Sequence, residues 1–242
     1  MSLTMSFPGK LCAAGALFLV ASAAFANENY AVTGNAYNVN NNLLVYSEYY
    51  TDMNHNREVT VNYTKPDGNI FATKTLFYTG EVTQPEFELH DKRDDEKVSA
   101  RFVDGRLVLS HSLNYSTNEK TIMNNASMVI DAGFDAFIQQ NWEKLTTGKK
   151  VNFMFALPTR VDTVRLQVRE VATDKTPLAA NDNPADWRYF VITPANRFAS
   201  IFADPIYLAY SPEKYLMRYQ GRSNLDDDKG GAWDVRIEYQ YR

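Results

Sequence analysis

Period-two alternation, interrupted at short intervals by turn-forming residues, runs through most of this chain. In "REVTVNYTKPDGNIFATKTLFY" the apolar residues Val59, Val61 and Tyr63 alternate with polar ones until the turn at 66–68 reverses the chain into residues 70–78. Alternation of this kind is typical of antiparallel strands, because successive side chains of a strand face opposite sides of its sheet. The segment therefore predicts a β-hairpin and places the chain in a mainly β class.

The same pattern continues along the sequence. The stretch "EFELHDKRDDEKVSARFVDGRLVLSHSL" predicts three strands, joined by a turn at 93–96 and by Asp104-Gly105, a two-residue loop that suits a type I′ turn. Further strands are predicted by "KKVNFMFALP", "VDTVRLQVREV" and "DWRYFVIT", and at residues 206–210, 215–222 and 233–241. Ten or more strands in this order predict an up-and-down antiparallel sheet.

Two segments break the alternation and predict helices. In "DAGFDAFIQQNWEKLTTG" the apolar residues recur at spacings of three and four, as on one face of a helix, with Asp131 as N-cap and Gly148 just past the end. A second, short helix is predicted to follow Thr193 as N-cap and Pro194 at its first position. The expected fold is mainly β (α+β): a curved antiparallel sheet or half-open barrel wrapped around one long helix, plus one short helix.

This layout resembles the half-open barrel of periplasmic lipoprotein carriers of the LolA and LolB type. Two segments, "GFDAFIQQNWEKLTTGKKVNFMFALPTR" and "RYQGRSNLDDDKGGAWDVRIEY", also resemble an uncharacterised proteobacterial family of exported proteins. The resemblance implies a fold and a compartment, and it brings no catalytic residue to any position of this sequence.

The first 26 residues have the pattern of a secretory signal peptide. Lys10 precedes an apolar run from Leu11 to Val20, and Ala24-Phe25-Ala26 supplies the small-residue motif that signal peptidases recognise. The run is too short for a transmembrane helix, which needs about 20 apolar residues. We therefore expect a signal peptide at 1–26, a single β-rich domain at 27–242, and a periplasmic protein that does not span the membrane.

Composition narrows the classes of partner. The only cysteine, Cys12, lies in the predicted leader, so the mature chain has no disulfide and depends on its core for stability. The formal net charge of the full chain is −4, and lysine and arginine do not cluster. Nucleic acids and anionic membrane surfaces require clustered positive charge, so we expect neither as a partner.

The sequence holds two candidates for specific chemistry, and both have simpler explanations. "NLDDDKGG" places Asn224, Asp226 and Asp228 at alternate positions, but Lys229 occupies the position where an EF-hand needs glycine, so a hairpin turn is expected and no metal site. His90 is expected in a row with Ser99 and Ser110, and His111 on the opposite face with Val98 and Asp91. A hydrolase built on these histidines stays a minor alternative, because no nucleophile motif accompanies them.

Aromatic residues on the predicted helices are the remaining feature. Phe134, Phe137 and Trp142 on the first helix, and Phe198 and Phe202 on the second, are expected either to fill the sheet interior or to line a cleft at its end. The leading hypothesis is a periplasmic binding or carrier module for an apolar, lipid-like ligand, without catalytic residue, cofactor or metal. The alternatives are a structural or protein-interaction module of the cell envelope, the hydrolase, and an outer-membrane barrel, against which the amphipathic helix counts.

Overall fold

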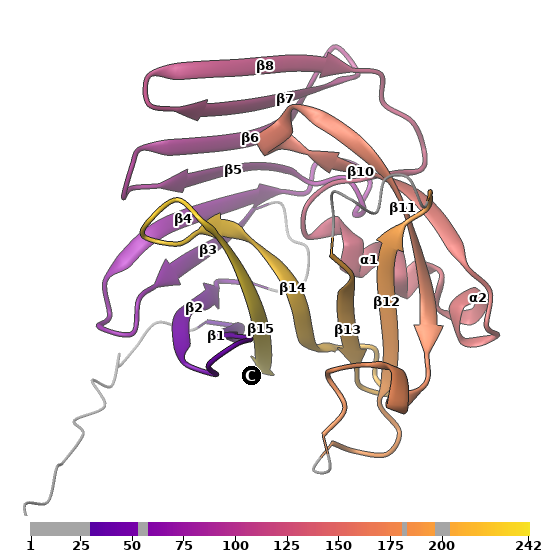
Figure 1. Ribbon diagram of the computed structural model, residues 1–242. Helices are drawn as coiled ribbons and strands as arrows, with labels where there is room; N and C mark the ends of the chain where they lie inside the picture. The colour runs from indigo at the N-terminus through magenta and orange to yellow at the C-terminus, as the bar shows by residue number, and fades with distance from the viewer. Residues whose placement is uncertain (1–29, 53–57, 181–182, 197–203) are drawn as a thin grey trace, which may run out of the picture.

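The computed structural model describes residues 30–52, 58–180, 183–196 and 204–242, and these form one curved antiparallel sheet with two short helices (Figure 1). The sheet has 15 strands in the order β8-β7-β6-β5-β4-β3-β2-β1-β15-β14-β13-β12-β11-β10-β9. Strands that are consecutive in the sequence are neighbours except β8 and β9, which form the two edges of the sheet, and the pairing of β1 with β15 joins the N-terminal and C-terminal halves. The predicted mainly β fold and up-and-down strand order are therefore confirmed.

The strands are 2 to 11 residues long and are separated by frequent turns. Their bounds are β1 (Val32–Asn38), β2 (Leu44–Tyr50), β3 (Glu58–Thr64), β4 (Ile70–Phe77), β5 (Glu86–Asp91), β6 (Glu96–Val103), β7 (Arg106–Leu113), β8 (Ser116–Ile122), β9 (Met128–Val129), β10 (Val151–Leu157), β11 (Asp162–Val171), β12 (Arg188–Pro194), β13 (Ile206–Tyr210), β14 (Leu216–Asp226) and β15 (Ala232–Tyr241). All the strand pairs are antiparallel except β9 with β10, which are parallel because the helices connect them.

The turns follow the sequence closely. Asp104 and Gly105 have φ values of 48° and 72°, the two positive angles that a type I′ turn requires between β6 and β7. Gly68, at 90°, lies in the predicted turn between β3 and β4.

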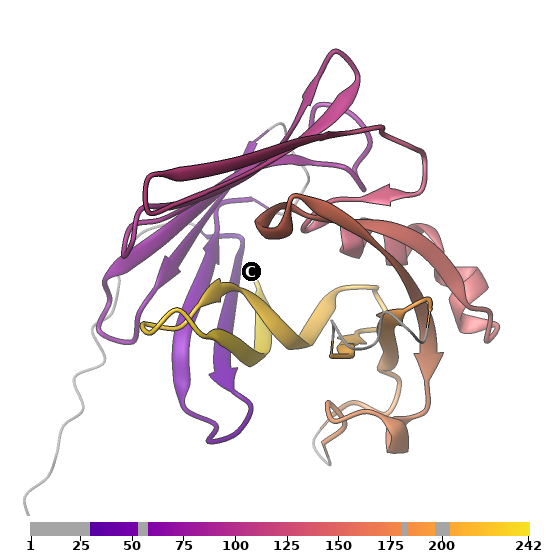
Figure 2. The ribbon, with the colours of Figure 1, turned by 45° about the horizontal axis from the view of Figure 1, so that its top comes forward.

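The sheet is open but strongly curved, so that its two end regions approach each other (Figure 2). The short 3-10 helix η1 (Pro158–Arg160), which follows β10, contacts β6 and β7. Lys120 of β8 and Asp162 of β11 form an ion pair of 3.0 Å between the same two regions. The apolar side chains of Met154 and Ala156 complete this closure by packing into the core formed by β1 to β7.

Two core clusters lie on one face of the sheet, which we call the inner face. The first contains buried residues of β1 to β7 and β15, such as Ala36, Val61 and Ile237. The second lies between the helices and β10 to β14, with Phe190 and Leu208 among its buried residues. Tyr219 and Tyr239 touch both clusters, so the inner face has a nearly continuous apolar interior.

The predicted long helix is wrong, because the helical segment is broken into α1 (Gly133–Gln140) and α2 (Trp142–Thr146). The break lies at Asn141, whose side-chain amide donates to the Phe137 carbonyl at 2.9 Å and whose φ and ψ are −102° and 11°. Asparagine side chains compete in this way for backbone groups inside helices. Gly148 lies directly after the helix end with φ of 82°, as expected.

The two predicted N-caps fail for different reasons. Asp131 does not cap α1, because its carboxylate binds Lys74 and Asn224 instead. Thr193 and Pro194 are the last residues of strand β12, where Thr193 pairs with Gln167 of β11. The remainder of the predicted short helix falls in 197–203, outside the described residues.

Candidate functional site

A cavity of about 80 Å³ opens on the inner face of the sheet, at one end of its strands. Val32 and Leu216 begin β1 and β14, whereas Tyr50 and Tyr241 end β2 and β15, so antiparallel pairing brings all four to this end. The first turn of α1 forms the opposite wall. The described residues that line this mouth cavity are Val32, Tyr50, Asp52, Val59, Leu76, Tyr78, Ala132, Phe134, Asp135, Leu216, Tyr239 and Tyr241.

A glycine makes room for one of the lining rings. Gly34 lies between Glu48 of β2 and Tyr239 of β15 in the strand pairing. A Cβ atom on Gly34 would approach Cε1 of Tyr239 to 2.8 Å, closer than carbon atoms pack. The missing side chain therefore allows the Tyr239 ring to lie across β1, beside the cavity.

A buried carboxylate lies directly beside the cavity. Glu48 is only 5% exposed, and its Oε2 accepts a hydrogen bond from the Tyr50 hydroxyl at 2.7 Å, with the Tyr239 hydroxyl at 3.4 Å. Burial raises the pKa of Glu48, which Lys74 partly opposes. Two of the tyrosines that line the cavity therefore direct their hydroxyl groups to Glu48.

A buried ion pair lies deeper on the inner face. Lys74 Nζ is 2.6 Å from Asp131 Oδ2, and the two side chains are 5% and 6% exposed. Burial disfavours the charged lysine, but the attraction of Asp131 outweighs it and the pKa of Lys74 lies above its ordinary value. Asn224 donates to the other oxygen of Asp131 at 2.9 Å, so strands β4 and β14 are both tied to the residues just before α1.

Asp135 brings a second carboxylate to the cavity wall from the first turn of α1. Its Oδ1 accepts from the Tyr210 hydroxyl at 2.8 Å, and its Oδ2 accepts from Gln139 Nε2 at 3.0 Å. Burial and the neighbouring Asp135 carboxylate raise the pKa of Tyr210 well above its ordinary value, so this hydroxyl stays a donor. The orientation of the Asp135 side chain is thereby fixed.

Two of the aromatic residues predicted from the sequence, Phe137 and Trp142, lie outside the cavity lining. Phe137 packs on Phe153 with ring centroids 4.8 Å apart, and Trp142 packs edge-on against Phe190 at 5.3 Å. Both are partly buried and pack against the second core cluster, and neither lines the mouth cavity. Phe134, one turn before Phe137, does line it. Phe198 and Phe202 lie outside the described residues.

Of the described lining residues, Val32, Tyr50 and Asp52 come from a segment for which the sequence predicted no strand, and the others lie on predicted strands or on the predicted helix. A usable signal was present in "YSEYY" at 46–50, where a glutamate alternates between Tyr46 and Tyr50 on one face of a strand. A charged residue in an inward-facing row of aromatics is unusual, because burial of a charge requires polar partners. That position is Glu48, and its partners are residues of the cavity wall.

The two described histidines form no catalytic arrangement with serine. His90 bonds Asp95 at 2.8 Å on the outer face, and His111 bonds Glu96 at 2.7 Å. The predicted pairing of Ser99 with Ser110 and of Val98 with His111 is confirmed. The predicted position of His90 is two residues out of register, since His90 pairs with Lys97.

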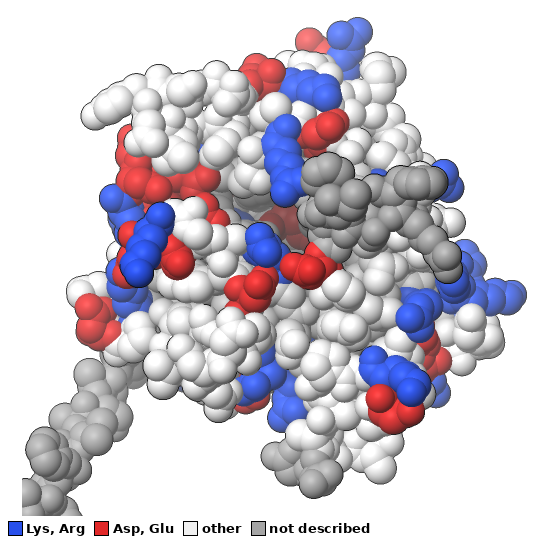
Figure 3. Space-filling model, in the orientation of Figure 1, with Lys and Arg blue, Asp and Glu red and all other residues white. Residues whose placement is uncertain are grey.

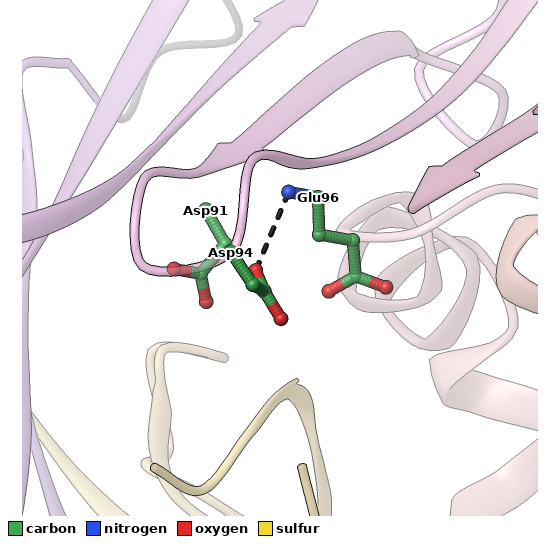
Figure 4. Close-up of side chains that lie close together, drawn as sticks. All are labelled: Asp91, Asp94 and Glu96. Carbon is green, nitrogen blue, oxygen red and sulfur yellow. Dashed lines mark hydrogen bonds between the residues drawn. The ribbon is translucent and has the colours of Figure 1, made fainter. Parts of the chain in front are cut away.

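Acidic side chains gather at the opposite end of the sheet, where the β5–β6 turn meets the β14–β15 hairpin (Figure 3). Carboxylate oxygens of Asp91, Asp94 and Glu96 lie within 4.8 Å of one another (Figure 4). Arg93 binds both Asp91, at 2.5 Å, and Asp228, at 2.9 Å.

Each of these acidic groups takes part in a structural contact. Asp94 accepts from the Glu96 backbone amide, and Glu96 binds His111. Asp227 accepts from the amides of Lys229 and Gly231, which makes "DDDKGG" a turn, as predicted. The acidic end of the sheet therefore fastens two hairpins together through Arg93.

No known protein family, curated protein sequence or solved structure matches this chain. In the described ranges, both α-helices are far shorter than a helix that crosses a bilayer.

Proposed function

We propose that this protein binds a small, largely apolar molecule at the mouth cavity and is a periplasmic binding or carrier module without catalytic activity. The observation that carries the proposal is the lining itself: rings and aliphatic side chains from β1 to β4, β14, β15 and α1 converge on one opening at the end of a sheet. Ligand sites are typically concave, mostly apolar and supplied with few polar groups. The N-terminal leader pattern and the resemblance to half-open barrel carriers support the compartment.

The lining also favours binding over conversion. The groups of catalytic type among the described lining residues are the carboxylates of Asp52 and Asp135 and the tyrosine hydroxyls, and Asp135 already accepts hydrogen bonds from Tyr210 and Gln139. The hydroxyls of Tyr50 and Tyr239 already bond Glu48. A hydrolase centred on His90 or His111 would lie away from this cavity.

The size of the cavity limits what it encloses. Its 80 Å³ is smaller than the cavity of about 150 Å³ that holds benzene in an engineered protein. About four methylene groups buried there would contribute about 3 kcal/mol, which corresponds to millimolar affinity. The enclosed part of the ligand is therefore one end of a chain or one small group, and the rest of the molecule lies across the rim.

A neutral fluorescent probe tests the proposal. N-phenyl-1-naphthylamine should bind wild-type protein saturably, and Ala132→Trp, which places an indole in the opening, should weaken that binding at least about tenfold. Ala172→Trp, at an exposed position outside the lining, is the matched control. Equal binding by both variants would contradict the proposed site.

The compartment has its own test. Protein recovered from the cells that naturally make it should begin at Asn27, because the proposed leader is removed after Ala26. Protein that still carries Met1 would contradict export through this leader.

A structural or interaction module is the second candidate, and the close packing of the interior favours it. Both core clusters are filled by side chains such as Tyr46, Phe153 and Tyr210, each no more than 1% exposed. Native mass spectrometry of gently purified protein distinguishes the two functions: a bound small molecule supports the carrier, and bare protein that takes up no probe supports the module.

A further inference from the structure

The chemical make-up of the mouth cavity is more specific than an apolar cleft needs. Five of its lining residues are aromatic: Tyr50, Tyr78, Phe134, Tyr239 and Tyr241. Two more, Asp52 and Asp135, carry carboxylates, and no lysine or arginine is among the described residues that line it. Aromatic rings surrounding a small opening, with acidic groups in the same wall, are the composition that binds organic cations.

Resting on the binding function proposed above, we infer that the ligand of the mouth cavity carries an organic cation, an amine or quaternary ammonium group, attached to an apolar body. The cation is held by the faces of the tyrosine and phenylalanine rings and by the carboxylates of Asp52 and Asp135. The apolar body extends across the rim, since the cavity encloses only a group of a few carbon atoms.

The charges around the cavity agree with a positive ligand. Glu48 and Asp131 lie close enough to interact with one ammonium, that of Lys74, and Lys74 is bound to Asp131 at 2.6 Å. Asp52 and Asp135 bring two further carboxylates to the described lining of the cavity. An anionic ligand such as a fatty-acid carboxylate would add to the negative charge and is disfavoured.

Asp135 acts on the cavity as a fixed negative charge. Hydrogen bonds from Tyr210 and Gln139 hold the carboxylate against the lining. Burial raises the pKa of the Tyr241 hydroxyl, and the negative charge of Asp135 adds to this rise. Because Tyr241 lines the cavity, the electrostatic potential of Asp135 reaches the cavity wall. An acidic residue in the first turn also stabilises α1 through the helix dipole, but that role by itself does not require a position on the cavity wall.

A matched series of ligands tests the inference. Decyltrimethylammonium, 1-decanol and decanoate share a ten-carbon chain and differ in head-group charge, and calorimetric titration gives their affinities. Decyltrimethylammonium should bind at least about tenfold more tightly than decanol, and decanoate should bind most weakly. Titration with tetramethylammonium chloride measures the affinity for the head group without a chain. If it binds much more weakly than decyltrimethylammonium, the apolar body is needed for binding.

Asp135→Asn keeps an oxygen that accepts from Tyr210 but removes the charge. It should lower the affinity for decyltrimethylammonium about five- to tenfold and leave the affinity for decanol unchanged. Asp162→Asn, at an exposed position on β11, is the matched control and should change neither. Asp52→Asn gives a second test of the same charge effect should Asp135→Asn fail to fold by circular dichroism.

The outcomes separate the two proposals. Decanol binding as tightly as the cation, or a cation affinity insensitive to both aspartate variants, overturns the cationic ligand and leaves the apolar site standing. Failure of every ten-carbon ligand to bind overturns the proposed function as well.

Discussion

Lys74 is the residue whose replacement tests the interior most severely. Lys74→Met keeps the length of the side chain and removes the ammonium, which leaves Asp131 buried without its cation. Breaking a buried ion pair from one side costs about 3–5 kcal/mol, because the remaining charge is neither hydrated nor paired. For a chain of this size that loss lowers the melting temperature by about 6–20 °C.

The assay is urea unfolding followed by tryptophan fluorescence, with Lys120→Met as the matched control. Lys120 forms an ion pair of similar length with Asp162, but both side chains are at least half exposed, so its loss should cost less than about 1 kcal/mol. Lys74→Met with Asp131→Asn removes both charges and should recover about 2 kcal/mol relative to Lys74→Met. A Lys74→Met protein no less stable than Lys120→Met would refute the reasoning.

Three further predictions concern other parts of the structure. Gly133→Ala should destabilise the fold by about 2–4 kcal/mol in urea, because a Cβ there would lie 2.2 Å from the Thr83 carbonyl oxygen, whereas Gly80→Ala, with open space around it, should be nearly neutral. The free energy of unfolding of Glu48→Gln, relative to that of wild type, should increase as the pH rises above about 4.5. Burial raises the pKa of Glu48 in the folded protein, so wild-type stability falls as the pH rises from about 4.5 through the raised pKa. A difference between the two proteins that does not change with pH would count against this. Calcium at 1 mM should leave the melting temperature unchanged, because Arg93 already occupies the acidic end of the sheet, and a shift of several degrees that a chelator reverses would show otherwise.

The parts of the fold that depend on local sequence patterns were predicted most accurately. Asp104-Gly105 fixed its turn and the β6–β7 register, because only one turn type accepts two positive φ angles in a two-residue loop. The four-residue connection before Glu96 leaves more freedom, and there the expected register was two residues out. The pattern at Thr193 and Pro194 also satisfies the rules for a helix start, but pairing with β11 decided the structure.

The mouth cavity depends on contacts that no local pattern reveals. Val32 and Tyr241 lie at opposite ends of the described chain and pair directly, as the closing strands β1 and β15. Asp131 shows the same limit. Its place in the sequence suggests an N-cap, but its carboxylate binds Lys74, which lies on a strand 57 positions earlier in the chain. The helical periodicity around Phe137 was real, but it did not separate Phe134, which lines the cavity, from Phe137 and Trp142, which pack against the second core cluster.

The most direct test of the account is a map of where an apolar molecule binds. In an NMR titration with 1-decanol, amide signals of Ala132, Phe134 and Tyr241 should shift most and saturate together, because these residues surround the mouth cavity. Signals of Phe137 and Trp142, which pack against the second core cluster and do not line the cavity, should shift little. The largest shifts at that core pair, or changes scattered over the surface without saturation, would contradict the proposed site.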